Sequence, residues 1–165
     1  MDDVEFLKWL VTSGADVNAR SALDESPLSK AIACGSMDAI RFLLAEGASV
    51  HHGDLLHHTA LRSNQQEGAL LAEDLIQRGT DINAYRFNNP VSFRWRAPYK
   101  QLTPLHVACL EKNIPVAQVL LRHGADPHRK ILHAGEEKGQ SPIEMSLESQ
   151  EEGLEKLFRD YDKMA

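Results

Sequence analysis

One stretch decides the fold: Thr103-Pro104-Leu105-His106-Val107-Ala108, followed by Val119-Leu120-Leu121 and then by Gly124-Ala125-Asp126-Pro127-His128. Thr103 is a suitable N-cap, and Pro104 at the first helical position lacks only a backbone N–H that would have no partner there. The apolar residues of 116–121 predict a second helix with a wide apolar face, which Gly124 ends in the left-handed conformation. Two helices this short cannot bury their apolar faces alone, so the unit needs neighbours of its own kind.

The chain contains further versions of this unit. Similar helix starts are Ser26-Pro27-Leu28, Thr59-Ala60-Leu61 and Ser141-Pro142-Ile143. Similar helix ends are Gly14-Ala15-Asp16, Gly47-Ala48-Ser49 and Gly79-Thr80-Asp81. The steps from Gly14 to Gly47, from Ser26 to Thr59 and from Gly35 to Gly68 are all 33 residues. A period of that size predicts a solenoid, in which each unit packs only against its neighbours.

These motifs resemble the ankyrin-repeat family, whose units carry Thr-Pro-Leu-His-x-Ala, then Leu-Leu, then Gly-Ala-Asp-x-Asn. The resemblance covers residues 1–161 and implies an all-α ankyrin-repeat solenoid of stacked helix-turn-helix units joined by β-turn loops, here called fingers. It also implies a protein-binding scaffold, and we expect no cofactor. We divide the single domain 1–165 as follows: a half repeat 1–20, repeats 21–52, 53–84, 103–130 and 139–161, a long inserted finger 85–102 and a short insertion 131–138.

Composition narrows the range of partners and locations. The formal net charge of −6 argues against nucleic acid and membrane surfaces as partners. No apolar segment approaches 18 residues, and the N-terminus lacks the features of a signal peptide. We interpret Cys34 and Cys109 as small buried thiols in a reducing compartment, without a disulfide between them. A cytoplasmic or nuclear location is therefore expected.

Residues 1–20 correspond to a second helix without its first helix. The apolar flank left open, which includes Phe6 or Trp9, has three possible covers. Upstream repeats could cover it, a second copy could cover it in a homodimer, or Trp9 could fold over it. At the other end, the polar residues of 148–156 are what a terminal cap needs.

The second repeat departs from the family pattern. Thr59-Ala60-Leu61 replaces Thr-Pro-Leu at the start of its first helix, so Arg62 stands at the usual His position and Asn64 at a usual Ala position. A buried Asn64 needs a polar partner or loosens the packing. Some distortion of this repeat is therefore predicted.

The long finger is the most informative stretch for function. Gly14 to Ser26 spans 12 residues, whereas Gly79 to Thr103 spans 24. Five of the ten aromatic residues of the chain and four basic residues lie in it: Tyr85, Phe87, Phe93, Trp95, Tyr99, Arg86, Arg94, Arg96 and Lys100. No acidic residue occurs between Asp81 and Glu111. Tyr, Trp and Arg are enriched at binding hot spots, so the finger suits an acidic or C-terminal peptide or an anionic small molecule.

Two other interpretations of the finger remain open. Its aromatic side chains could pack on the concave face only to hold a long loop in place. Single-stranded nucleic acid could also stack on them, although the acidic chain disfavours that partner.

The histidines divide into two groups. His51, His106 and His128 fall at repeat positions where side chains hydrogen-bond between neighbouring units. His57, His58 and His133 are less constrained and are better candidates for ligand contact. No spacing of Cys and His suits zinc, so no metal site is predicted.

We predict recognition of another protein or an acidic peptide through the concave groove and the long finger. The predicted partner-binding residues are Tyr85, Arg86, Phe87, Phe93, Arg94, Trp95, Arg96, Tyr99, His57, His58 and His133. Four further residues are expected to line the approach: Asp24, Glu25, Lys30 and Arg62.

The alternative is a small-molecule-binding or catalytic protein, with a His/Arg/Tyr-lined groove under the same finger. The sequence has no nucleophile elbow, phosphate loop or paired-carboxylate motif, which favours a non-enzyme. A closed pocket under the finger would favour the alternative, and a shallow groove would favour a polypeptide partner. A third possibility is that the chain is a fragment of a longer repeat protein that spaces other domains.

Replacing Trp95 and Arg96 together with Ala should abolish partner binding and barely change the melting temperature. The reason is that a binding residue contributes to the complex and not to the fold. Binding and thermal unfolding of the variant and the parent chain test this. A fall of many degrees would instead identify the finger as packing material.

Overall fold

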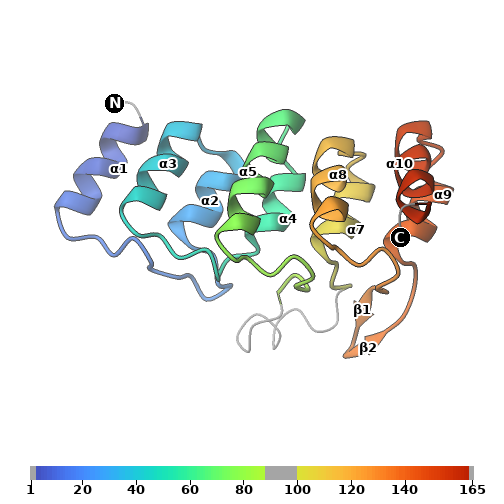
Figure 1. The fold of residues 1–165 in the computed structure, drawn as a ribbon. Helices are drawn as coiled ribbons and strands as arrows, with labels where there is room; N and C mark the ends of the chain where they lie inside the picture. The colour runs from blue at the N-terminus through green and yellow to red at the C-terminus, as the bar shows by residue number, and fades with distance from the viewer. Residues whose placement is uncertain (1–2, 88–99, 164–165) are drawn as a thin grey trace.

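The protein is a row of helix pairs, as seen in a computed structural model that describes residues 3–87 and 100–163 (Figure 1). The first described helix, α1, spans Asp3–Thr12. Four pairs follow it: α2 Pro27–Cys34 with α3 Met37–Ala45, α4 Leu55–Ala60 with α5 Gln65–Gln77, α7 Pro104–Leu110 with α8 Ile114–Arg122, and α9 Pro142–Glu148 with α10 Glu152–Asp162. A small antiparallel hairpin, β1 Leu132–His133 and β2 Glu136–Glu137, lies between α8 and α9.

The first helix of three pairs starts with a reciprocal capping box. Ser26, Thr103 and Ser141 are the N-caps, and each is followed by Pro at the first helical position. The box satisfies backbone N–H groups that have no partner inside the helix. These starts lie where the sequence predicts them.

One apolar seam runs through the stack, between an inner layer of first helices (α2, α4, α7, α9) and the second helices. Leu28, Leu56 and Leu105 from the inner layer and Ile40 and Leu120 from the second helices are at most 1% exposed. All five belong to one continuous buried cluster. The helix-pair solenoid predicted from the repeats is therefore confirmed.

The predicted start of the second repeat at Thr59 is wrong. The helix α4 begins at Leu55, after Asp54, so Thr59 and Ala60 lie in its last turn and are buried. Only seven residues separate Gly47 from the N-cap Asp54, compared with 12 from Gly14 to Ser26. The loop 48–54 is thus a truncated finger, and α5 is 13 residues long where α3 has nine. Because these two changes nearly cancel, the period of 33 residues conceals them.

Two residues of this repeat have roles other than those predicted. Asn64 is the N-cap of α5, where its side chain accepts the Glu67 backbone N–H, so it is exposed and not at a buried Ala position. Gly68 lies inside α5 and does not turn the chain as Gly35 does. A Cβ at Gly68 would lie 2.5 Å from the Thr59 carbonyl oxygen, so the absence of a side chain lets α5 approach α4.

Both ends of the row expose apolar side chains. Phe6 and Trp9 on α1 stack with their ring centroids 5.9 Å apart and are 48% and 58% exposed. At the other end α10 buries Leu154 and Phe158, whereas Leu147 on α9 is 64% exposed. The three covers that the sequence predicts for this flank stay predictions.

The two cysteines differ from each other. Cys109 is buried as predicted, and burial raises the pKa of its thiol to about 12. Cys34 is a free thiol at an exposed position, so the prediction that both are buried is wrong for Cys34. It stands two positions further along α2 than Cys109 stands on α7, which turns it toward solvent.

Within residues 3–87 and 100–163, none of the helices has both the length and the apolar character that a bilayer crossing requires.

Replacing Asn113 with Ala should lower the free energy of unfolding by about 2–3 kcal/mol. The buried Asn113 side chain caps α8 by accepting the Val116 N–H, and its Nδ2 donates to the Ala60 carbonyl at 3.0 Å. The matched control is Asn64→Ala, which removes an exposed cap alone and should cost about 1 kcal/mol. Urea denaturation measures both variants. Equal losses would show that the bond between the repeats adds nothing.

Candidate functional site

The base of the long finger is fixed to the stack on both sides. The Arg86 N–H donates to the Leu102 carbonyl at 2.9 Å, which closes the finger at its root. Gln101 and Leu132 exchange two backbone hydrogen bonds of 2.7 and 3.0 Å, so the returning chain pairs with β1. The base of the finger is therefore held by backbone hydrogen bonds within itself and to the next insertion.

Tyr85 is part of this support. Its ring is 5% exposed, and its hydroxyl lies 2.7 Å from the Lys130 carbonyl oxygen and 2.9 Å from Glu137 Oε1. The Arg129 guanidinium lies over the same ring, 4.5 Å from its centroid. The polar end and one face of Tyr85 are thus occupied within the chain, and its contact with a partner stays a prediction.

Asp54 anchors the other side of the finger base. It has φ = 54°, in the left-handed region, and its side chain makes no cap bond to α4. Instead both carboxylate oxygens accept the Phe87 N–H, at 3.1 and 3.3 Å, and Arg86 Nε lies 3.9 Å away. Burial raises the pKa of Asp54 to about 6, although the Phe87 N–H and Arg86 oppose the shift.

His57 occupies the position of the repeat that the sequence analysis gave to Arg62. Its Nε2 lies 2.9 Å from the Leu102 carbonyl, as His106 Nε2 lies 3.2 Å from the Gln140 carbonyl one repeat later. A carbonyl only accepts, so Nε2 carries the proton. His57 is 1% exposed and ties one repeat to the next through Nε2, and its contact with a partner stays a prediction.

The other ring nitrogen of His57 distinguishes it from His106. In His106, Nδ1 lies 3.2 Å from the Thr103 backbone nitrogen and 2.7 Å from its hydroxyl. In His57, Nδ1 is buried and has no hydrogen-bond partner, because Asp54 faces the finger in place of completing a capping box. Burial lowers the pKa of His57 to about 3, so the ring is neutral and Nδ1 is a free acceptor.

Arg62 is not a residue of the approach. It donates to the Ile32 carbonyl at 2.8 Å and to the Gly35 carbonyl, and it pairs with Glu67 at 2.8 Å. Its side chain is only 11% exposed, so it joins α2 to the second repeat. The sequence analysis misplaced it because it misaligned that repeat.

His58 marks the electropositive part of the inner layer. The half-buried ring has its pKa lowered to about 4, first by burial and then by the charges of Arg86 and Lys30. Lys30 is exposed on α2, and Arg86 also lies 4.8 Å from the centroid of the Phe87 ring. Arg86 is thus close to both His58 and Phe87 at the finger base, and contact of these residues with a partner stays a prediction.

The remaining predicted residues are separated from this group or lie outside the described ranges. His133 is exposed on β1. Phe93, Arg94, Trp95, Arg96 and Tyr99 fall in 88–99, outside the residues that the structure describes, so their contact with a partner stays a prediction. His51 and His128 are exposed, and the ties between fingers are made by Asn18 to Gly47 and Ser49 and by Asn83 to Gly124 and Asp126.

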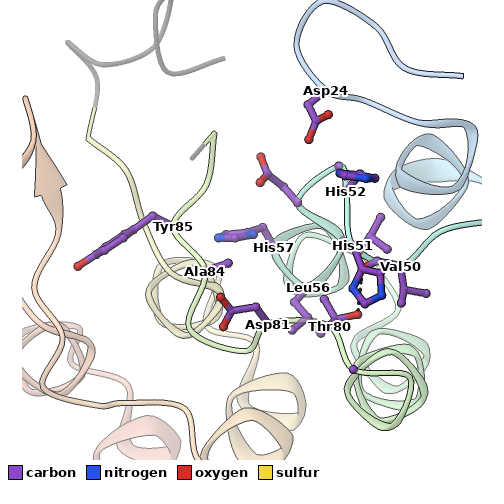
Figure 2. Close-up of a pocket in the computed structure, with 14 residues that line it drawn as sticks. Asp24, Val50, His51, His52, Leu56, His57, Thr80, Asp81, Ala84 and Tyr85 are labelled. Atoms are coloured by element: carbon purple, nitrogen blue, oxygen red, sulfur yellow. Dashed lines mark hydrogen bonds between the residues drawn. The ribbon is translucent and has the colours of Figure 1, made fainter. Parts of the chain in front are cut away.

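A half-open hollow of about 310 Å³ lies against the truncated finger (Figure 2). Three consecutive fingers border it, with Asp24 from the first, residues 50–54 from the truncated one and residues 79–85 from the base of the long one. Figure 2 shows the His57 ring between Asp24, above it, and Asp81, below it. The carboxylates in its lining are Asp24, Asp54 and Asp81, and within the described ranges no Lys or Arg lines it.

A second hollow, of about 450 Å³, lies between α3 and α5 and is lined mainly by apolar residues. Among the residues that the structure describes, no three His, Cys, Asp or Glu side chains gather in a way that could hold a metal ion.

Comparison with known families agrees with this fold. The family model for ankyrin repeats in three copies matches residues 2–86, and the model for a single ankyrin repeat matches residues 100–131. The chain therefore belongs to the ankyrin-repeat family, as the sequence predicts. Ankyrin repeats generally mediate binding between proteins.

Three similar proteins are much longer than this chain. It is 30% identical over 149 residues to the mitochondrial disaggregase of Bos taurus, an alignment that covers 90% of this chain and 20% of that protein. The human mitochondrial disaggregase is 29% identical, with coverages of 90% and 24%. The ankyrin repeat and KH domain-containing protein mask-1 of Caenorhabditis elegans is 27% identical, with coverages of 78% and 6%. The chain thus spans at most a quarter of these three relatives.

Sequence reasoning missed Asp54, the residue that connects the finger base, His57 and the hollow. A signal was present in Asp54-Leu55-Leu56-His57, which matches Thr-Pro-Leu-His at its third and fourth positions. The better match of Thr59-Ala60-Leu61 at its first position concealed it.

Three histidines should make stability fall steeply with acid. Burial lowers the pKa of His57 to about 3 and those of His58 and His106 to about 4, from 6.5. Their contribution is fully present above pH 6.5 and is lost as pH falls toward 4, since only the unfolded rings take up protons. At pH 5, proton uptake by the unfolded chain lowers the free energy of unfolding by roughly 2 kcal/mol for each of these histidines.

Asp54 has the opposite effect, because its contribution to the free energy of unfolding grows as pH falls. Its pKa is raised from 3.8 to about 6, so its contribution is fully present below pH 3.8 and is lost as pH rises through 6. Asp54→Asn should therefore lose about 1 kcal/mol more than the parent chain between pH 7 and pH 5. Urea denaturation at both values measures this, with Asp38→Asn on the surface of α3 as the control. Equal losses in the parent and in Asp54→Asn would contradict the role of Asp54.

Proposed function

We propose that the chain binds an extended segment of a partner polypeptide across the inner layer of helices, beside the base of the long finger. The observation that carries this is a pair of exposed leucines. Leu61 at the end of α4 and Leu110 at the end of α7 are 40% and 55% exposed. Each stands seven residues after its N-cap, so the two occupy the same position on adjacent packed helices. Each offers an apolar contact to a segment bound across the two helices.

The two ends of this face carry opposite charges. Lys30 and Arg86 make its N-terminal part positive, and the exposed Lys100 adds to the charge at the finger base. Toward the C-terminal end, Glu111 follows Leu110, and Glu148 occupies the position equivalent to Leu61 and Leu110. A partner with an acidic residue near Lys30 and Arg86 and an apolar residue over the leucines would match this pattern.

The aromatic and basic residues of 88–99 extend this proposal. The finger base is held by Asp54, Leu102 and Leu132. We expect Trp95 and Arg96 to contact a bound segment as hot-spot residues.

The small-molecule or catalytic alternative is less well supported. The hollow at the truncated finger is half open, so it is neither the closed pocket that would favour a small molecule nor the shallow groove that would favour a polypeptide. In this hollow, one ring nitrogen of His57 already donates a hydrogen bond to the Leu102 carbonyl, and burial keeps the ring neutral. Its position serves binding better than proton transfer near neutral pH.

The double variant Leu61→Ser and Leu110→Ser should weaken peptide binding at least about tenfold, because it removes the apolar contact. Peptides selected from a random display library with the parent chain provide the ligands, and fluorescence anisotropy gives their Kd values.

Leu70→Ser on α5 is the matched control, since Leu70 is 68% exposed but lies on a second helix. Its Kd values should equal those of the parent chain. Selected peptides that bind the double variant as tightly as the parent would place the site elsewhere and overturn the proposal.

A further inference from the structure

The hollow at the truncated finger has a chemical character of its own. It arises because the loop 48–54 is short while the fingers on both sides are longer, so Asp24 and Ala84 from those fingers both line the gap. Leu61 and Leu110 are not among the residues that line the hollow, which lies next to Arg86 through Asp54. A partner held on the inner layer therefore has a neighbouring depression within reach.

We propose that this hollow receives an arginine side chain of the bound partner. The proposal rests on the proposed function, and it names one residue type that the partner must carry.

The charges around the hollow favour a cation. Its lining has three carboxylates, of which Asp24 pairs with Arg20 at 2.8 Å and Asp54 has Arg86 only at 3.9 Å. Asp24 and Glu25 both add to the negative potential at Asp54. Asp81 is exposed at the opposite wall. A guanidinium placed between Asp54 and Asp81 would balance this excess.

The buried His57 ring adds an independent requirement for a donor. Its Nδ1 is an acceptor without a partner in a side chain that is 1% exposed, and the ring borders the hollow. A buried acceptor without a donor is unfavourable by about 1–3 kcal/mol, and the neighbouring Asp54 cannot donate while ionised. An N–H group entering the hollow would satisfy Nδ1 and a carboxylate together.

Arginine fits these groups better than lysine. Its planar guanidinium has five N–H donors in fixed directions, so one side chain can serve an imidazole nitrogen and two carboxylates. A planar group also suits the edge of the Tyr85 ring, which belongs to the same lining. The volume of about 310 Å³ is at the lower limit for ligand pockets, which suits one inserted side chain.

The test is a titration of the whole chain with N-acetyl-L-arginine amide, followed by the ¹⁵N and ¹³C signals of the histidine rings in NMR spectra. We expect saturable shifts at His57, larger than those at His106, with a millimolar Kd. The neutral isostere N-acetyl-L-citrulline amide should shift His57 little, and N-acetyl-L-lysine amide should bind several-fold more weakly than the arginine probe. Equal shifts with arginine and citrulline, or none with arginine, would overturn the proposal.

Two variants sharpen the result. Asp54→Asn keeps an oxygen that can accept the Phe87 N–H and should weaken arginine binding at least fivefold. Asp38→Asn, on the exposed surface of α3, should leave it unchanged. If Asp54→Asn disturbs the spectrum widely, Asp81→Asn replaces it with the same expectation, and unaltered binding in that variant counts against the site. The Leu61 and Leu110 double variant should bind the arginine probe normally, which separates this site from the peptide groove.

Discussion

The structure depends on a neutral imidazole that donates a hydrogen bond from one repeat to the backbone of the next. His57 reaches the Leu102 carbonyl, and His106 reaches the Gln140 carbonyl. Each bond fixes the distance between a first helix and the finger that follows it, although the intervening insertions differ in length. Burial keeps both rings uncharged, so the bond retains one direction of donation. The insertions between repeats can differ in length because the bond from the imidazole to the next repeat is the same in both cases.

The sequence predicts the fold well because the repeat unit has strong local signals. Thr103-Pro104 and Ser141-Pro142 start helices for reasons contained in the two residues themselves, and Gly124 ends one for a similar reason. The second repeat lacks the proline, so its start depends on which leucines are buried, a property of the folded chain. Leu55 and Leu56 decide it, and Thr59 is drawn into the helix interior.

The binding site is less predictable because several of its properties arise from packing. Tyr85 is an attractive binding residue in the sequence, but the Lys130 carbonyl and Glu137 beside its hydroxyl come from an insertion 45 to 52 residues later. Asp54 looks like a loop residue, and only its left-handed backbone turns its carboxylate toward Phe87. The opposite charges of the hollow and the finger base also appear only when the fingers are placed side by side.

The spacing of the second helices has a consequence for how the stack comes apart. The helices α5 and α8 pack closely, as do α1 and α3, whereas α3 and α5 make little direct contact across the apolar groove between them. In a linear array each unit is held only by adjacent units, so cooperativity is lost first at the weakest boundary. At the boundary between α1–α3 and the rest, the contact lies mainly in the inner layer, where α2 packs on α4. Bending of the stack at this boundary would move Asp24 relative to Asp54 and Asp81, and so would change the acidic hollow.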